Sequence, residues 1–221
     1  MRNKLLVILC FFFALVYVIG CTQAPQTPTA TQTQTSGGAN QPTQNQISPQ
    51  KQTISADVQD LLDKHKSKVS NIYYKYKGPQ TSDNFYDFYV KGGKIKYKPY
   101  FASKVLDRQD SFDSIFIDKA AKTAQSYCAD RTCVYKGKKG DLNYDDAYIS
   151  TIFDWIDVKQ AAKLGEEVID DRSTWKLQTD KGIVWVDTYY GIPLKADSSG
   201  KSYRFTQLSV NSVQDSDVTP S

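Results

Sequence analysis

Residues 182–210, GIVWVDTYYGIPLKADSSGKSYRFTQLSV, carry the clearest structural signal in the chain. They predict two strands joined by a turn and followed by a third strand. Gly191 and Pro193 turn the chain between the first two strands, with Pro193 at a point where no backbone donor is needed. Leu194 then returns to the apolar side. We therefore expect an antiparallel sheet in the C-terminal part of the chain.

Other segments show the period-two alternation of strands that have one apolar and one polar face. The alternation is clearest in residues 71–77 (NIYYKYK), where every second side chain is Ile or Tyr. Further strands are predicted in FYDFYVKGG at 85–93, in KIKYK at 94–98, around a turn near Lys119 to Lys122, in GEEVIDD at 165–171 and in STWKLQT at 173–179.

Apolar residues recur at helical spacing in three places. Residues 56–72 follow Ser55, which can cap a helix. Residues 145–156 (DDAYISTIFDWI) show the same spacing, and residues 157–164 (DVKQAAKL) begin with a capping Asp and are followed by Gly. Because helices and strands are segregated, the predicted class is α+β: a curved antiparallel sheet with an N-terminal helix and short mid-chain helices.

The N-terminal residues resemble an export signal. A basic start precedes an apolar run from Leu5 to Ile19, which is shorter than the roughly 20 residues that span a membrane. Residues 18–21 (VIGC) resemble the lipobox of prokaryotic lipoproteins, in which the Cys becomes the first residue and carries lipid. On this interpretation Cys21 anchors the chain to a membrane, on its periplasmic side or outer surface. The alternative is an ordinary signal peptide or an uncleaved anchor in which Cys21 is incidental.

Composition divides the chain into four parts. A signal peptide at 1–20 precedes a lipid-anchored linker at 21–53, rich in Thr, Gln and Pro, which cannot bury enough apolar surface to fold. As a flexible coil this linker would span roughly 30 Å. The folded domain is predicted at 54–214, with a tail at 215–221.

Charge and cysteine content restrict the partners and cofactors. The net charge of +4 includes two basic residues of the signal, so a nucleic-acid role is unsupported. Cys128 and Cys133 are predicted to form a hairpin disulfide. The alternative is a two-thiol metal or redox site, but with one His in the chain a four-ligand zinc centre of the usual kind cannot be assembled. We expect no metal and no cofactor.

Catalytic motifs are missing from the sequence. It contains no G-x-S-x-G elbow, no phosphate-binding glycine loop, no H-E-x-x-H and no dinucleotide fingerprint. A single His leaves little for a catalytic triad. Adjacent acidic residues such as Glu166 and Glu167 point to opposite faces of a strand and do not form a catalytic pair. We therefore expect a protein that is not an enzyme.

The C-terminal pattern resembles a known superfamily. Trp185 and Asp187 end one strand, residues 191–195 (GIPLK) follow, and the last strand leads to Val218 and Pro220. This is similar to the LolA/LolB-like superfamily of outer-membrane lipoprotein carriers and acceptors. The resemblance implies a half-open β-barrel with a helical lid over an apolar cavity. The predicted lipid anchor makes the chain more similar to the anchored acceptor than to the soluble carrier. The same half-barrel also serves as a sensing module in envelope-stress regulators.

The aromatic content is high, with 15 Tyr, 10 Phe and 3 Trp. Aromatic residues on the apolar face of a curved sheet can line a cavity for an acyl chain, with residues 145–164 as the lid. The alternative is a filled core. Around Trp185 the inner face stays ambiguous, because Val184 and Val186 compete for it. The residues assigned to ligand binding are Ile72, Tyr74, Tyr76, Tyr86, Phe88, Val90, Ile95, Tyr97, Trp175, Leu177, Tyr203 and Phe205.

Two functional hypotheses follow from the sequence. The first is a monomeric, membrane-anchored extracytoplasmic lipoprotein that binds a lipid or a lipoprotein acyl chain for carriage or sensing. The second is a surface interaction module of the same fold with a filled core, which binds a protein or a glycan. A dye that fluoresces in apolar cavities distinguishes them.

Overall fold

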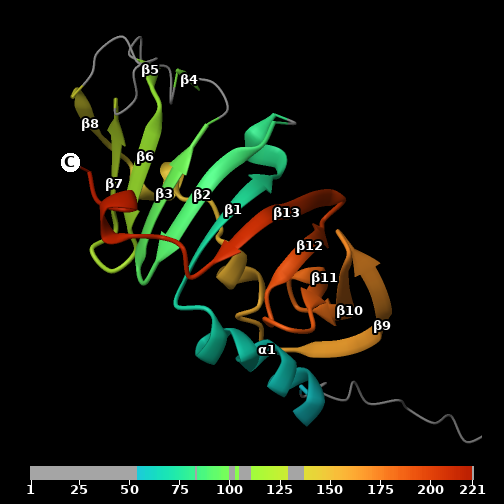
Figure 1. Cartoon of the computed structure of the whole chain (residues 1–221). Coiled ribbons are helices and arrows are strands. Elements are labelled where there is room, and N and C mark those ends of the chain that lie inside the picture. The colour runs from blue at the N-terminus through green and yellow to red at the C-terminus, as the bar shows by residue number, and fades with distance from the viewer. Residues whose placement is uncertain (1–53, 83, 100–102, 105–110, 129–136, 221) are drawn as a thin grey trace, which may run out of the picture. The chain divides into compact units, whose positions relative to one another are not determined.

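The computed structural model describes residues 54–82, 84–99, 103–104, 111–128 and 137–220 (Figure 1). The predicted signal peptide at 1–20, the linker at 21–53 with Cys21, and Cys133 lie outside the described residues. Within the described ranges, no helix has the length and apolar character needed to cross a membrane.

Eleven strands form one antiparallel sheet in the order β8-β7-β6-β3-β2-β1-β13-β12-β11-β10-β9. A separate pair is formed by β4 (Ser103–Lys104) and β5 (Ser111–Phe112). The outer strands β8 and β9 are not paired with each other, so the sheet is open, and the predicted α+β class is confirmed. The strands are β1 Asn71–Lys77, β2 Tyr86–Lys91, β3 Lys94–Lys98, β6 Ser114–Asp118, β7 Thr123–Tyr127, β8 Lys139–Leu142, β9 Ala161–Ile169, β10 Arg172–Thr179, β11 Gly182–Asp187, β12 Pro193–Ser198 and β13 Lys201–Val210.

The strand registers place the apolar side chains on one face of the sheet. Tyr74 on β1 is opposite Phe88 on β2, and Phe88 is opposite Tyr97 on β3. Their neighbours along the strands, such as Lys75 and Asp87, point to the other face. The inner face therefore carries the core and the outer face is polar, as the alternation predicts.

The helix α1 (Ala56–Lys68) packs Val58, Leu61 and Leu62 against this core. The hydroxyl of Ser55 donates to the carboxylate of Asp57 and makes no capping bond to the backbone, so the predicted side-chain cap is absent. The helix is shorter than predicted, because β1 begins at Asn71 and pairs with β2 and β13.

Two lysines of α1 hold the turn between β11 and β12. Lys64 Nζ donates to the carbonyl oxygen of Thr188, and Lys68 Nζ donates to that of Tyr189, both at 2.8 Å. Gly191 follows in this turn with φ +70°, and a Cβ atom there would overlap the carbonyl oxygen of Leu61. The turn predicted from the sequence is therefore also the docking point of α1.

The mid-chain segment is less helical than predicted. The helix α2 (Tyr144–Ala147) is a single turn, in which the side chain of Asn143 accepts two backbone N–H groups. The 3-10 turn η3 (Ile152–Trp155) starts anew at Thr151, whose backbone N–H and hydroxyl both bond to the carboxylate three residues further on. Two separate caps thus divide the helix predicted for residues 145–156.

The helix predicted for residues 157–164 is wrong. Residues 161–164 belong to β9, which pairs with β10 along nearly its whole length. Eight residues form only a marginal helix, and the ladder to β10 overrides their local propensity. The register shifts opposite Lys176 and Leu177, which leaves Leu164 as a bulge in β9. The segment expected to form a helical lid is therefore α2, η3 and irregular chain; we call residues 144–160 the strap.

Residues from the predicted tail pack on the sheet. The 3-10 turn η4 (Asp215–Asp217) brings the carboxylate of Asp215 to 3.0 Å from Lys91 Nζ. Val218 is buried and, with Phe116, lines a small pocket beside β3 and β6. The C-terminal segment thus covers part of the outer face (Figure 1).

Candidate functional site

The structure brings most of the twelve predicted ligand-binding residues together in one buried cluster. Three of the twelve, Tyr86, Trp175 and Tyr203, are only partly buried and pack against the cluster from its margin. The other nine are 0–5% exposed: Ile72, Tyr74, Tyr76, Phe88, Val90, Ile95, Tyr97, Leu177 and Phe205.

The aromatic rings of this cluster contact one another. The ring centroids of Tyr74 and Phe88 are 5.3 Å apart, and those of Phe88 and Tyr97 are 5.2 Å apart in a stacked arrangement. Phe205 meets Tyr74 edge-on at 5.8 Å. Such distances are those of packed aromatic pairs, so the rings fill the inner face of β13, β1, β2 and β3.

Two tyrosine hydroxyls of the cluster bind the strap. The Tyr74 hydroxyl accepts the backbone N–H of Ile152 at 3.2 Å, and the Tyr97 hydroxyl donates to the carbonyl oxygen of Ala147 at 3.0 Å. Burial raises the pKa of both phenols above its usual value, which keeps them protonated. The strap is therefore fixed to the core by polar contacts as well as by its apolar side chains.

Trp185 lies on the outer face, which resolves the ambiguity of β11. Val184 and Val186 belong to the core cluster. The Trp185 indole N–H donates to the carboxylate of Glu167 at 2.8 Å, and Lys195 Nζ lies 4.0 Å from the ring centroid.

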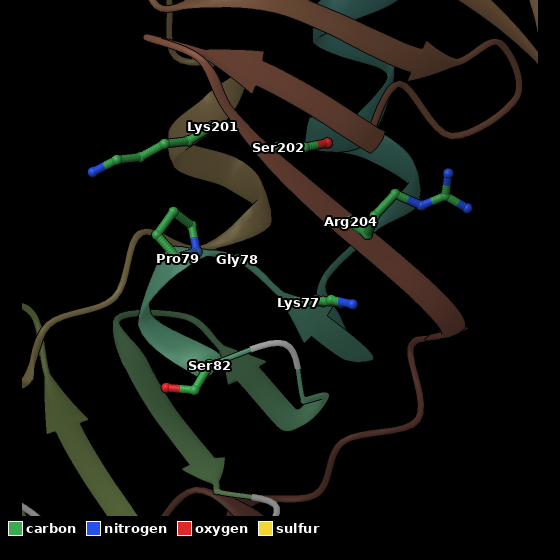
Figure 2. Close-up of a pocket in the computed structure, with 7 residues that line it drawn as sticks. All are labelled: Lys77, Gly78, Pro79, Ser82, Lys201, Ser202 and Arg204. Atoms are coloured by element: carbon green, nitrogen blue, oxygen red, sulfur yellow. The ribbon is translucent and has the colours of Figure 1, made fainter. Parts of the chain in front are cut away.

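Two pockets flank the 3-10 turn η1 (Pro79–Thr81). The first has a volume of about 540 Å³ and lies between this turn and the first residues of β13 (Figure 2). The second, of about 370 Å³, lies between the strap and the sheet, and we call it the Trp155 pocket. Its lining residues are Tyr76, Gln80, Ser150, Asp154, Trp155, Asp180, Lys181, Ser198 and Tyr203.

The Trp155 pocket combines aromatic rings with polar groups. The rings of Trp155 and Tyr203 lie 4.5 Å apart, and the buried indole Nε1 of Trp155 has no hydrogen-bond partner in the described part of the chain. Tyr76 donates its hydroxyl proton to Gln80 Oε1 at 2.8 Å. Burial would raise the pKa of Asp180, but backbone N–H groups at residues 159 and 160 hold it below the usual value.

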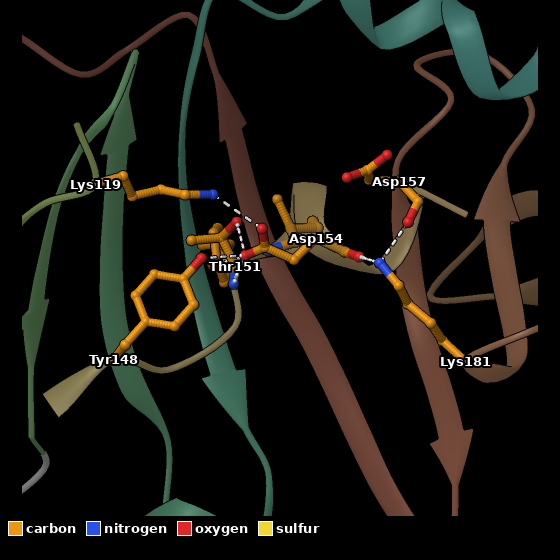
Figure 3. Close-up of polar contacts among 8 residues, drawn as sticks. Lys119, Tyr148, Thr151, Asp154, Asp157 and Lys181 are labelled. Carbon is orange, nitrogen blue, oxygen red and sulfur yellow. Dashed lines mark hydrogen bonds and ion pairs between the residues drawn. The ribbon is translucent and has the colours of Figure 1, made fainter. Parts of the chain in front are cut away.

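Asp154 connects the strap to both halves of the sheet (Figure 3). Its carboxylate accepts hydrogen bonds from Tyr148 at 2.6 Å, from Thr151 and, at 2.9 Å, from Lys119 in the turn between β6 and β7. Lys181, in the turn between β10 and β11, donates to the backbone carbonyl oxygen of Asp154.

The surroundings of Asp154 favour the charged form of its carboxylate. Burial would raise its pKa, but the hydrogen bonds from Tyr148, Lys119 and Thr151 outweigh this and hold the pKa below its usual value. Burial and the hydrogen bond to Asp154 raise the pKa of Tyr148 to about 12. The carboxylate is therefore charged and the phenol neutral at neutral pH.

Of the twelve residues predicted to bind a ligand, only Tyr76 and Tyr203 line the Trp155 pocket. The prediction missed Trp155, Gln80 and Asp180, which come from three separate turns of the chain. One feature of the sequence could have pointed to Trp155 as a site residue: it is one of three tryptophans in the chain and directly follows the Thr-x-x-Asp cap. The ligand-binding role of the twelve residues stays a prediction, as does the disulfide between Cys128 and Cys133.

Comparison with known proteins gives matches only among solved structures. No family model and no curated protein matches the chain. A LolA superfamily protein from Nitrosomonas europaea shares 12% identity over 75% of this chain and 99% of its own, with a TM-score of 0.31.

MucB structures also match. One shares 14% identity over 76% of this chain, with a TM-score of 0.41, and MucB from the MucA/MucB complex of Pseudomonas aeruginosa shares 16% identity over 75% of it, with a TM-score of 0.40. The chain covers 64% and 62% of those MucB chains. The superfamily of the Nitrosomonas europaea protein is the one that the C-terminal motif resembles.

Proposed function

We propose that this chain, an open antiparallel half-barrel of LolA-like type, is a membrane-anchored extracytoplasmic binding module that takes its ligand at the Trp155 pocket while its core stays filled. The ligand class that fits is a glycan unit. The role is one of binding and not of catalysis, and the predicted lipidated Cys21 supplies the anchor. The module acts as a monomer at the surface of its membrane.

The filled inner face is the observation that supports this proposal over acyl-chain binding. An acyl chain inserted under the strap would separate Tyr74 from Ile152 and Tyr97 from Ala147. Each separation leaves a buried polar group without a partner, at a cost of about 1–3 kcal/mol.

The chemistry of the Trp155 pocket suits a sugar ring. Trp155 and Tyr203 both line the pocket, and the partly exposed Tyr203 ring, which is packed on Trp155, offers apolar surface on which the C–H face of a sugar can stack. Gln80 and Asp180 provide acceptors for hydroxyl groups, and Lys181 provides a donor. A few placed polar groups beside aromatic walls are typical of small-ligand sites.

The first test separates the filled core from a lipid cavity. In an uncharged detergent the full-length chain should add no 1-anilinonaphthalene-8-sulfonate fluorescence to that of the detergent alone. Its native mass spectrum should show no lipid other than the one predicted to be covalently attached to Cys21. A bright dye together with a lipid-sized adduct released by organic solvent would overturn the filled core and favour the acyl-chain hypothesis.

The second test concerns the pocket itself. On an array of neutral and acidic oligosaccharides, Tyr203→Ala should lose the signals that the unchanged chain gives, because it removes one stacking ring. The matched control is Tyr189→Ala, since Tyr189 is 62% exposed in the turn between β11 and β12. An array on which the unchanged chain binds nothing, or on which both variants bind alike, would contradict a glycan site at Trp155.

A further inference from the structure

The groove in Figure 2 carries an excess of positive charge. Its charged lining residues are Lys77, Lys201 and Arg204, and Ser82 and Ser202 add hydroxyl groups. Among the described residues, no carboxylate lines it. Its volume of about 540 Å³ is within the range of ligand sites. This lining favours a negatively charged occupant.

The cations of the groove lie on two sides of β13. In Figure 2, Lys201 projects to one side, whereas Lys77 and Arg204 project to the other. Lys77 and Arg204 are register partners across β1 and β13. Side chains that diverge in this way do not enclose one small anion, but they can contact successive groups of a longer one.

A row of cations continues from the groove across the outer face. Arg204 is the register partner of Lys195 on β12, whose Nζ lies over the ring of Trp185. Adjacent strands are about 4.8 Å apart, so Lys77, Arg204 and Lys195 form a row about 10 Å long. Regularly spaced positive charges complement a chain of regularly spaced negative charges.

An anionic ligand can displace the carboxylates that pair with two cations of this row. Arg204 pairs with Asp170 at 3.1 Å, and Lys195 pairs with Asp197 at 2.9 Å. All four side chains are partly exposed, and exposed ion pairs contribute little to stability. An anionic ligand can therefore exchange with these carboxylates. The Lys201 side chain forms no hydrogen bond or ion pair with another described residue, whereas its backbone pairs with Ser198 in the sheet.

We propose that the groove and the adjoining row bind a linear polyanion, a chain with repeated phosphate or carboxylate groups. Lys201 contacts one anionic group, Arg204 and Lys77 contact the next, and Lys195 extends the track. The groove is recessed between η1 and β13, which suits a single chain better than a flat membrane surface. This site is separate from the Trp155 pocket, so the proposal does not depend on the glycan proposal.

The test compares a linear polyanion with a single anion. The full-length chain in an uncharged detergent is titrated calorimetrically with linear inorganic polyphosphate and with orthophosphate. Lys201→Glu should weaken polyphosphate binding by about tenfold or more, because it reverses a charge in the groove. Lys139→Glu on β8 makes the same change in net charge away from the groove and should weaken binding by less than about twofold. Added salt should weaken binding to the unchanged chain.

Three outcomes would overturn the proposal. Equal losses in the two variants would mean diffuse attraction to the net charge. Orthophosphate binding as tightly as polyphosphate would mean a single-anion site. Binding to phosphatidylglycerol vesicles over phosphatidylcholine vesicles, lost in Lys201→Glu, with no response to polyphosphate, would mean a membrane surface. Circular dichroism of each variant checks that the fold is intact.

Discussion

Gly191 is the residue at which the turn between β11 and β12 packs against the backbone of α1. Its positive φ favours glycine, and the carbonyl oxygen of Leu61 occupies the space that a side chain would need. Gly200 has a similar φ of +73°, but a Cβ atom there would meet nothing within 4 Å. Substitutions at these two glycines therefore distinguish the effect of backbone conformation on stability from the effect of close packing.

Replacing Gly191 by Ala should lower the free energy of unfolding by about 2–4 kcal/mol, because the strained φ is added to an overlap with α1. Gly200→Ala should cost about 1 kcal/mol, from the backbone alone. Urea unfolding followed by circular dichroism measures both. Equal costs would show that α1 does not press on this turn.

At the scale of the element, the strap owes its conformation to specific polar contacts. It has only one helical turn and one 3-10 turn. The core hydroxyls of Tyr74 and Tyr97 bond to its backbone, and Asp154 holds its middle. Removing one of these contacts should loosen the strap before it unfolds the sheet.

Tyr74→Phe should destabilise the domain by about 1–3 kcal/mol, because it leaves the buried N–H of Ile152 without an acceptor. Amide hydrogen exchange should accelerate in residues 148–156 more than in β1. Tyr86→Phe is the control, since the Tyr86 hydroxyl makes no hydrogen bond to another described residue. Equal acceleration in the two variants would contradict this account of the strap.

The elements show which parts of the fold local sequence can predict. Alternation identifies β1 and β3 with their observed bounds, because each has one buried and one polar face. The helix predicted for residues 157–164 does not form. The Ala-Ala-Lys-Leu sequence favours a helix locally, but hydrogen bonding to β10 makes these residues part of β9. The Trp155 pocket is not predictable in this way, because Gln80, Trp155 and Asp180 come from three turns that meet only through the curvature of the sheet.

At the scale of the whole molecule, Asp154 links distant parts of one sheet. Lys119 follows β6 and Lys181 follows β10, and both reach the same strap residue (Figure 3). In the sheet order, five strands separate β6 from β11. The strap thus joins the two halves of an open sheet that no strand pairing closes.

Asp154→Asn should destabilise the domain by about 2 kcal/mol at pH 7, because charge-assisted hydrogen bonds are lost. The pKa of Asp154 lies below its usual 3.8 in the folded chain. Its stabilising contribution is therefore complete above that value and is lost as the pH falls through the lower folded pKa.

Urea midpoints between pH 7 and pH 3 should accordingly fall less steeply for Asp154→Asn than for the unchanged chain. Asp145→Asn, at an exposed position in α2, is the control and should follow the unchanged chain. If Asp154→Asn and the unchanged chain lose stability in parallel, Asp154 does not join the two halves of the sheet as described.

The bulge at Leu164 has a consequence for copies of the chain that share a surface. An open sheet offers unpaired backbone at its rim, and neighbouring molecules held on a membrane would meet there at high local concentration. The irregular backbone at Leu164 and the charged Lys163–Glu166 pair interrupt that rim on β9, while β8 is only four residues long. Both rims are thus poor templates for strand addition, which disfavours self-association of the chain into fibrils.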